Sequence, residues 1–377
     1  MTELDPLLTT LTERGGSDLF LTVDAPPMIK VSGRLEPLSE TPLDTGAVDS
    51  LAAEALGPER HAEFQHAHEA NCALVRDEDR RYRVSAFYQR GTAGLVIRRI
   101  ETEIPSLEAL NLPPIVHDLA ETKRGLVLFV GGTGTGKSTS LAAMLGHRNA
   151  SASGHILTVE DPVEFVHHHR QCLVTQREVG VDTDSFDTAL RNALRQAPDV
   201  LLIGEIRSRE VMDHAVAFAE TGHLVLATLH ANNANQALDR IINFFPSDRR
   251  EQLLMDLSLN LQAVVAQQLV PTSDGQGRVA ALEVMLNTPL IQERIRSGDI
   301  HELKSIMAKS EQHGMQTFDH HLYRLYSEGR ISYESTLAHA DSANEVRLMI
   351  KLQGDTPEAD TDSEADSAGP QLRLRDP

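Results

Sequence analysis

The chain has 377 residues, 41% of them hydrophobic, and a formal net charge of −20, so it is long enough for two or three domains with a sizeable core. The acidic balance opposes binding of duplex nucleic acid, which needs a basic surface, and no apolar run approaches the roughly 18 residues of a membrane span. The acidic amino terminus lacks the basic and apolar regions of a secretory signal, so we expect a cytoplasmic protein without direct membrane insertion.

The first hundred residues show the short, mixed patterns of a small α+β domain. An amphipathic pattern near residues 5–14 predicts a helix, and Pro26-Pro27 marks a turn between two strand-like stretches. Alternating apolar and polar residues at the end of this region predict a hairpin around a turn at 91–94. The expected elements are a helix at 5–14, strands at 18–23 and 28–31, helices across 45–66 and two strands between 82 and 100.

The pattern changes after three prolines, Pro105, Pro113 and Pro114, which mark a domain boundary. From Gly125 onward, short unbroken apolar runs alternate with helical patterns, as expected for parallel strands that are buried on both faces. The runs are 126–130, 156–159, 200–203 and 224–229, and helices are expected after Ser247 and after Thr288. We therefore expect an N-terminal α+β domain at 1–101, a linker at 102–120, an α/β nucleotide-binding domain at 121–351 and a disordered acidic tail at 352–377.

One motif matches the phosphate-binding P-loop at every fixed position, G-x-x-x-x-G-K-[ST]. Its glycines let backbone N–H groups curl around phosphates without side-chain clashes, and the following helix points its positive end at the same anion. Lys137 is expected to reach the β- and γ-phosphates, and the Ser138 hydroxyl is expected to hold Mg²⁺. A chance glycine loop is the alternative, but an apolar strand precedes the motif and a helical pattern follows it. The residues expected to bind ATP are Gly131, Gly132, Thr133, Gly134, Thr135, Gly136, Lys137, Ser138 and Thr139.

Two acidic segments follow the P-loop along the chain. Residues 199–207 include an apolar run that leads to Glu205, which is typical of the strand that places a carboxylate beside the metal and the attacking water. A second box carries Glu160, Asp161 and Glu164 at a strand end. We expect at least one of these three carboxylates to position water as a general base, and the pattern leaves open which one does so.

Histidines stand out at two places. His223 and His230 flank the apolar run at 224–229, but a histidine at a strand end is more often structural than catalytic, so the pattern alone does not favour a functional role. Three consecutive histidines occupy 167–169. Because successive residues of an extended chain point to opposite sides, these three cannot easily share one metal ion, and we interpret them as a surface cluster.

Taken in order, the P-loop, the EDPVEF box, the LLIGEIR strand and the TGHLVLATLH box resemble the motifs of the secretion ATPase superfamily, whose members drive type II secretion and type IV pili. The resemblance spans Leu19 to Ile350, and the combination is far more specific than each motif alone. It implies a hexameric ring in which a PAS-like N-terminal domain is joined flexibly to a RecA-like ATPase domain, with ATP between the two domains.

The same resemblance implies roles for individual residues. Phosphoryl transfer gains most from positive charge around the developing anion, and an arginine finger contributes roughly 10³–10⁵ in rate in other NTPases. A solvated strand face is the alternative interpretation of the two arginines that match. The implied roles are phosphate and Mg²⁺ binding for Lys137 and Ser138, activation of water for Glu164, support of the metal for Glu205, sensing of the γ-phosphate for His230 and His223, and closure over the nucleotide for Arg83 and Arg98.

Differences within the family favour its retraction branch. Extension motors usually carry a four-cysteine zinc element and a longer N-terminal region, whereas this chain has two isolated cysteines. The stretches 230–246 and 253–260 and the acidic extension after Lys351 look like the PilU branch, while the AIRNLIR signature of the PilT branch is replaced at 291–296. Ser208 stands where the family usually has Asp, which puts the local ion pairing in doubt.

We therefore expect a homo-hexameric ATPase that powers or assists type IV pilus retraction, with ATP and Mg²⁺ bound. Its expected partners are a PilT-like retraction ATPase and the inner-membrane pilus platform protein, which would place it peripherally at the cytoplasmic side of the pilus base. A nucleotide-dependent coupling module with little hydrolysis is the alternative, although a pure binder has no need of Lys137, Glu164 and Glu205 together. A nucleic-acid translocase is opposed by the acidic charge and by an aromatic content of 4%.

Overall fold

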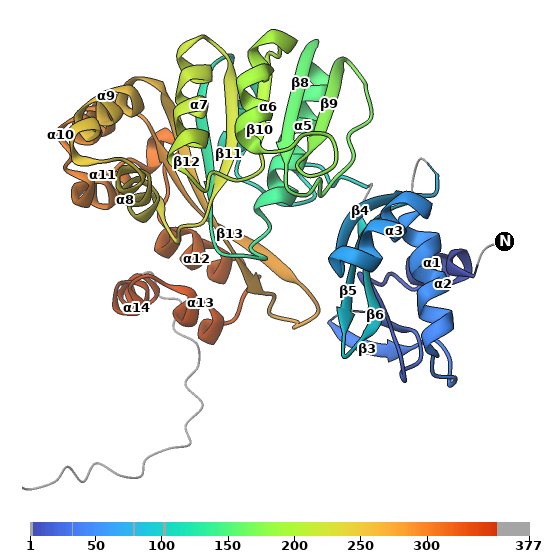
Figure 1. Ribbon diagram of the computed structural model, residues 1–377. Helices are drawn as coiled ribbons and strands as arrows, with labels where there is room; N and C mark the ends of the chain where they lie inside the picture. The colour runs from blue at the N-terminus through green and yellow to red at the C-terminus, as the bar shows by residue number, and fades with distance from the viewer. Residues whose placement is uncertain (1–2, 32, 78–79, 101–102, 353–377) are drawn as a thin grey trace, which may run out of the picture.

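The computed structural model describes residues 3–31, 33–77, 80–100 and 103–352. They form two units that lie side by side, one around a six-stranded sheet and one around a seven-stranded sheet (Figure 1). The mixed α/β fold class predicted from the sequence is confirmed. Of the tail predicted at 352–377, all but Leu352 lies outside the described residues.

The N-terminal unit is an antiparallel sheet with helices packed on one face. Its strand order is β3-β2-β1-β6-β5-β4. Alternation along the strands sends Leu19, Val84 and Ile97 into the core beneath the helices and turns their neighbours toward the other face. The elements are α1 (Leu4–Glu13), β1 (Asp18–Thr22), β2 (Met28–Val31), β3 (Arg34–Pro37), α2 (Thr45–Leu56), α3 (Pro58–Ala67), β4 (Glu69–Val75), β5 (Arg81–Gln89) and β6 (Thr92–Ile100).

The other face of this sheet carries a row of charged residues. Asp18 on β1 lies directly opposite Lys30 on β2 and Arg98 on β6. Arg98 in turn lies directly opposite Arg83 on β5. Because directly opposed residues of antiparallel strands point to the same face, the two arginines singled out by the sequence lie on one surface.

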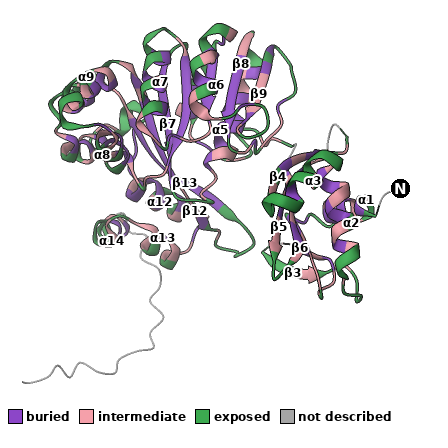
Figure 2. Cartoon of the chain, viewed as in Figure 1, coloured by how far each residue is buried: buried purple, intermediate pink, exposed green. Residues whose placement is uncertain are grey.

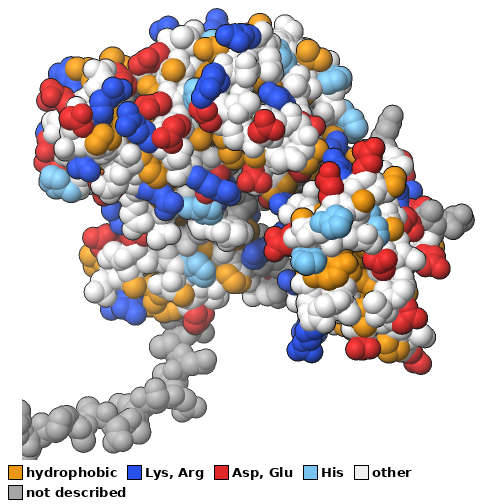
Figure 3. Space-filling model, viewed as in Figure 1, with side chains coloured by type: hydrophobic (Ala, Val, Ile, Leu, Met, Phe, Trp, Pro, Cys, Tyr) orange, Lys and Arg blue, Asp and Glu red, His pale blue; other side chains and the backbone are white. Residues whose placement is uncertain are grey.

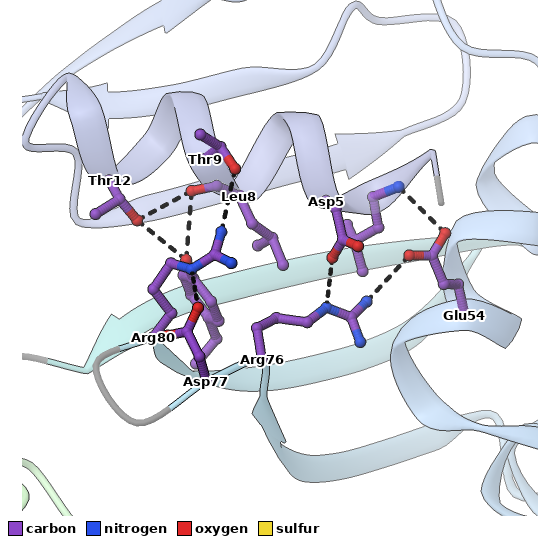
Figure 4. Close-up of polar contacts among 10 residues, drawn as sticks. Asp5, Leu8, Thr9, Thr12, Glu54, Arg76, Asp77 and Arg80 are labelled. Carbon is purple, nitrogen blue, oxygen red and sulfur yellow. Dashed lines mark hydrogen bonds and ion pairs between the residues drawn. The ribbon is translucent and has the colours of Figure 1, made fainter. Parts of the chain in front are cut away.

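Ion pairs and hydrogen bonds fix helix α1 to the rest of the N-terminal unit (Figure 4). Arg76, which follows β4, lies 2.6 Å from the carboxylate of Asp5 on α1 and 3.0 Å from that of Glu54 on α2. The hydroxyl oxygen of buried Tyr82 lies 3.0 Å from that of Thr12. None of these five residues is among those that line the cavity described below.

The C-terminal unit is a sheet of order β13-β12-β7-β11-β10-β8-β9 in which the neighbouring strands are parallel except for the antiparallel pair β12–β13. The elements are α4 (Pro114–Glu121), β7 (Gly125–Val130), α5 (Lys137–Ser151), β8 (Gly154–Glu160), β9 (Cys172–Glu178), α6 (Phe186–Ala193), β10 (Val200–Ile203), α7 (Arg209–Glu220), β11 (Leu224–Leu229), α8 (Ala234–Phe244), α9 (Arg250–Asn260), β12 (Leu261–Pro271), β13 (Arg278–Leu286), α10 (Pro289–Ser297), α11 (Leu303–Ala308), α12 (Phe318–Ser327), α13 (Tyr333–His339) and α14 (Ala343–Leu352).

The central strands of this sheet are buried on both faces, as their unbroken apolar sequences predict (Figure 2). On β7, Leu128 packs into the core on one face and Phe129 into the core on the other. Val116 and Leu119 of α4 belong to the same core as Phe129. The segment expected as a linker at 102–120 therefore contributes a helix that packs on the seven-stranded sheet.

Acidic and basic side chains are interspersed over the face shown in Figure 3, so the net negative charge is not gathered into one patch there. Among the described residues, no helix combines the length and the apolar character needed to cross a membrane.

Candidate active site

A cavity of about 570 Å³ opens at the carboxyl edge of the parallel strands. The P-loop follows β7, and Glu164, Glu205 and His230 follow β8, β10 and β11, so four chain segments meet at one edge of the sheet. Arg98 of the N-terminal unit lines the same cavity. The carboxyl edge is where open α/β sheets bind ligands.

The P-loop needs glycine at two positions where the protein leaves no room for a side chain. Gly131 has a φ of +155°, and a Cβ atom there would lie 2.5 Å from the carbonyl oxygen of Gln267. Gly136 has a φ of +86°, and a Cβ atom there would lie 2.8 Å from Nε2 of Gln267. The loop therefore packs closely against β12, and its residues 133–139 are left to line the cavity.

Gln267 holds the P-loop, and the sequence motifs do not identify it. Its side chain is 3% exposed; Nε2 donates to the carbonyl oxygen of Thr135 at 2.9 Å, and Oε1 accepts from the Ser140 hydroxyl at 2.8 Å. The second half of the loop and the first turn of α5 are thereby tied to one strand. The signal available in the sequence is a polar amide within the apolar run at 261–271.

Lys137 begins helix α5 and is largely buried at the wall of the cavity. Its ammonium group donates to the carbonyl oxygens of Gly131 at 2.9 Å and Gly132 at 2.7 Å. Burial lowers the pKa of Lys137, and the negative charges of Glu205 and Glu164 oppose that shift. A cation between two carboxylates and the loop amides is placed to bind phosphate oxygens.

Glu205 lies at the centre of a polar network. Its carboxylate is 3.2 Å from Nε2 of His230 and 2.6 Å from Nε of Arg207. Arg207 also approaches Asp161 of the acidic box at 3.4 Å. Ser208, which departs from the usual family residue, accepts from the backbone N–H of Val211 as the N-cap of α7, so the ion pairs of Arg207 form without an aspartate at this position.

The three carboxylates of the acidic box lie in different surroundings. Glu160 is buried, and burial raises its pKa to about 6, although hydrogen bonds from Thr158 at 2.7 Å and Gln176 at 3.3 Å lower it. Asp161 pairs with Arg207, as described above. All three carboxylates line the cavity, and Glu164 is exposed there and is neither buried like Glu160 nor paired with Arg207 like Asp161. Of the three, Glu164 is therefore the carboxylate best placed to reach a water molecule inside the cavity.

Two residues expected at the nucleotide lie outside the cavity. Arg83 is one strand away from Arg98. His223 precedes β11, whereas the P-loop follows the neighbouring strand β7, and these strands run parallel for six residues. That length places His223 roughly 20 Å from the loop, at the opposite edge of the sheet. Its Nδ1 lies 3.0 Å from the Thr221 hydroxyl, which is a structural contact.

Of the histidines at 167–169, His168 and His169 are exposed, as a surface cluster predicts, whereas His167 is buried. His167 is 8% exposed, and its backbone N–H donates to Oε1 of Gln176 at 2.7 Å. Burial lowers the pKa of His167 to about 4. No group of three or more potential metal ligands occurs within the part of the chain that the structure describes.

A smaller cavity of about 200 Å³ adjoins the P-loop at Gly136 and Thr139. Leu110 and Leu269 give it apolar walls, and Arg278 lines both this cavity and the larger one. The larger cavity is thus lined by charged residues and the smaller one is partly apolar. Both lie beside the start of α5.

Comparisons with known proteins show the family to which the chain belongs. The family described as type II/IV secretion system protein matches residues 72–336. The type IV pilus ATPase PilU of Pseudomonas aeruginosa is 61% identical over 95% of this chain and 94% of its own length. The type IV pilus retraction ATPase PilT of the same organism is 40% identical over 88% of this chain and 96% of its own length.

A solved structure supports the same relationship. The crystal structure of the pilus retraction motor PilT with bound ADP is 36% identical to this chain, with a TM-score of 0.85 over 93% of this chain and 100% of that chain. The fold is therefore shared over 93% of this chain. The chain belongs to the type II/IV secretion system protein family and, within it, to the type IV pilus retraction ATPases.

Proposed function

We propose that this chain hydrolyses ATP to ADP and phosphate, and that a hexameric ring of it uses this reaction to power or assist type IV pilus retraction and twitching motility. The observation that carries the proposal is the single cavity of about 570 Å³ that brings together the P-loop, Glu164, Glu205, His230 and Arg98. The name of the PilT relative, a retraction ATPase, supports retraction as the task of the motor.

In this proposal the P-loop and Lys137 bind the β- and γ-phosphates, and Glu164 acts as the general base. Lys137 already donates to two oxygen acceptors, and phosphate oxygens are stronger acceptors than the loop carbonyls. Glu164 removes the proton of the attacking water, because an exposed carboxylate beside the phosphate site is a suitable acceptor. Glu160, which is buried, stabilises the acidic segment that also carries Asp161 and Glu164.

The residues present fit a Mg²⁺ ion. Ser138 and Glu205 line the same cavity and offer a hydroxyl oxygen and a carboxylate oxygen, the ligand types that this cation prefers. When bound, Mg²⁺ would neutralise charge on the phosphate oxygens. His230 and Arg207 orient the carboxylate of Glu205, since each contacts one of its oxygens.

Positive charge on the far side of the phosphates comes from Arg98, with Arg83 one strand behind it. We assign no contact with the nucleotide to His223. The smaller cavity, with apolar walls at Leu110 and Leu269, suits the base and ribose of the nucleotide.

We further propose that the chain assembles with a PilT-like ATPase and with the inner-membrane platform protein at the pilus base, because its PilU relative belongs to that machine by name. The division into an N-terminal PAS-like domain at 1–101 and a RecA-like domain at 121–351 remains part of this proposal. It is supported by the two separate sheets, although α4 within 102–120 packs with the second of them.

The test is the Mg²⁺-dependent ATPase rate per subunit, measured against protein concentration for the native chain, Glu164→Gln and Glu293→Gln. Glu293 is an exposed glutamate on α10 that does not line the cavity, so it controls for loss of a charge. We expect a rate that rises with concentration, collapses in Glu164→Gln and is kept in Glu293→Gln. ATP binding without turnover in the native chain would favour the coupling module instead.

A further inference from the structure

Arg98 is held by a carboxylate from another strand. Its Nε donates to Oδ1 of Asp18 at 2.8 Å, and the Ser17 hydroxyl donates to Oδ2 of Asp18 at 2.8 Å. Asp18 and Arg98 are directly opposed in the β1–β6 pair, so the backbone register itself brings them together. We propose that Asp18 is the positioning residue for Arg98, which orients the guanidinium toward the phosphates of ATP. This inference rests on the proposed role of Arg98 at the nucleotide.

Asp18 is buried, although it lies on the face of the sheet away from the helices. It is 4% exposed, and on its other side lies Lys30 of β2. A buried carboxylate is costly unless it is paired and hydrogen-bonded. Arg98 and Ser17 supply these partners, so each oxygen of Asp18 accepts a hydrogen bond. Asp18 is therefore fixed, and an arginine bound to it is fixed through it.

The way in which Arg98 is held leaves its tip available. Asp18 contacts Nε, the nitrogen nearest the backbone, and the side chain of Arg98 is 68% exposed. Arg98 lines the cavity that contains Lys137 and Glu205. The two terminal nitrogens of a guanidinium form the fork that binds phosphate oxygens in pairs. The hydrogen bond at Nε thus limits the motion of the Arg98 side chain and leaves its two terminal nitrogens available for phosphate.

An arginine on a strand surface otherwise samples many rotamers, and only a fraction of them point into the cavity. Fixing the reacting groups in advance lowers the barrier, and a small misplacement costs as much as roughly 100-fold in rate. Asp18 supplies this preorganisation without touching the nucleotide. Neither the P-loop nor the acidic and histidine motifs indicate this role.

The experiment measures kcat and KM for ATP in the assembled full-length protein for Asp18→Asn, Arg98→Gln and the double variant. Asp5→Asn is the matched control, because Asp5 also pairs with an arginine, Arg76, in the same unit but away from the cavity. We expect Asp18→Asn to lower kcat about 10-fold with little change in KM, and Arg98→Gln to lower it roughly 100-fold or more. The double variant should match Arg98→Gln, and Asp5→Asn should keep the native kcat.

A chemical rescue separates positioning from mere folding. Guanidinium ion at millimolar concentration is expected to restore part of the activity of Arg98→Ala, because the carboxylate of Asp18 recruits it. The same rescue should be lost in the Asp18→Asn, Arg98→Ala double variant. Thermal melting of each variant shows whether the fold is kept, and the rescue comparison holds even where stability falls.

Four results overturn the inference. If Asp18→Asn keeps the native kcat while Arg98→Gln is impaired, or if the two effects add fully in the double variant, Asp18 does not act through Arg98. If Asp18→Asn raises kcat, the ion pair keeps Arg98 away from the phosphates instead of orienting it toward them. If Arg98→Gln keeps the native kcat, Arg98 does not act at the nucleotide. This single variant therefore tests the proposed role of Arg98 separately from the role of Asp18.

Discussion

Nδ1 of His321, on α12, accepts a hydrogen bond of 2.9 Å from the backbone N–H of Leu282, on β13. A ring nitrogen that accepts from an N–H carries no proton, so this contact holds the imidazole neutral. Burial lowers the pKa of His321 to about 3, and the positive charge of Arg324 contributes to the shift. The contact joins the C-terminal helices to the edge strand of the ATPase sheet.

We expect this histidine to make the fold acid-sensitive. Between pH 3 and the unfolded pKa of about 6.5, the unfolded chain binds a proton that the folded chain does not, so stability falls as pH falls through this window. From pH 7.5 to pH 5 the loss is about 2 kcal/mol. Urea unfolding at pH 5 and pH 7.5 measures it, with His321→Gln as a neutral comparison. Equal pH slopes in the two proteins would contradict the assignment.

Glu283 is expected to act in the opposite direction. It is buried on β13, accepts from the backbone N–H of Ala234 at 2.8 Å, and burial raises its pKa to about 7. The folded chain keeps the proton up to about pH 7, whereas the unfolded chain releases it near pH 4.3, so stability is lost as pH rises between these values. Glu283→Gln, which also accepts from Ala234, should be more stable than the native chain by about 3.5 kcal/mol at pH 8 and similar at pH 4.

The comparison for Glu283 has a clear opposite outcome. A carboxylate at the N-terminus of α8 is favoured by the helix dipole, and Lys304 lies near enough to lower its pKa. If Glu283→Gln is less stable than the native chain at pH 8, the ionised form is the one that stabilises the start of α8.

Gln267 offers a test of how the P-loop is shaped. Gln267→Ala removes the bonds to Thr135 and Ser140, so we expect KM for ATP to rise and kcat to fall, with a combined loss of roughly 10-fold or more in kcat/KM. Gln268→Ala is the matched control: its Nε2 donates to the carbonyl oxygen of His339, away from the loop. Steady-state ATPase assays should separate the two neighbours. Similar kcat/KM values for both variants would show that Gln267 is merely a packing residue.

Ser208 gives a prediction about the cap of helix α7. Its side chain caps the N-terminus of α7, and Asp serves this position as well as Ser. Ser208→Asp should therefore leave stability and ATPase activity unchanged, whereas Ser208→Ala should cost about 1 kcal/mol. Chemical denaturation measures both variants. A large loss of activity in Ser208→Asp would mean that an acid here disturbs the pairs of Arg207.

The strands of the ATPase sheet could be predicted where sequence and environment agree. The runs that became β7, β8, β10 and β11 are short and apolar, and burial on both faces explains them. The pair β12–β13 was not predicted. β12 begins at Leu261, directly after α9 ends at Asn260, so no turn residue marks the change from helix to strand.

In the site, too, some contacts could be predicted from the sequence and others could not. Motifs at strand ends could be expected to meet, because the carboxyl ends of parallel strands share one edge. The contact between Ser140 and Gln267 joins residues 127 positions apart, and no local pattern encodes it. Likewise, alternation puts Arg83 and Arg98 on one face, but only the placement of the two units decides that Arg98 lines the cavity.

The cavity takes its walls from both units. Arg98 belongs to the N-terminal unit, whereas Lys137, Glu164 and Glu205 belong to the C-terminal unit. A rotation of one unit against the other therefore moves a positive charge relative to the γ-phosphate of bound ATP. Turnover would then be fast in only one relative orientation. A mechanical load that resists this rotation should slow hydrolysis, so that the enzyme consumes ATP at a pace set by the force on the filament.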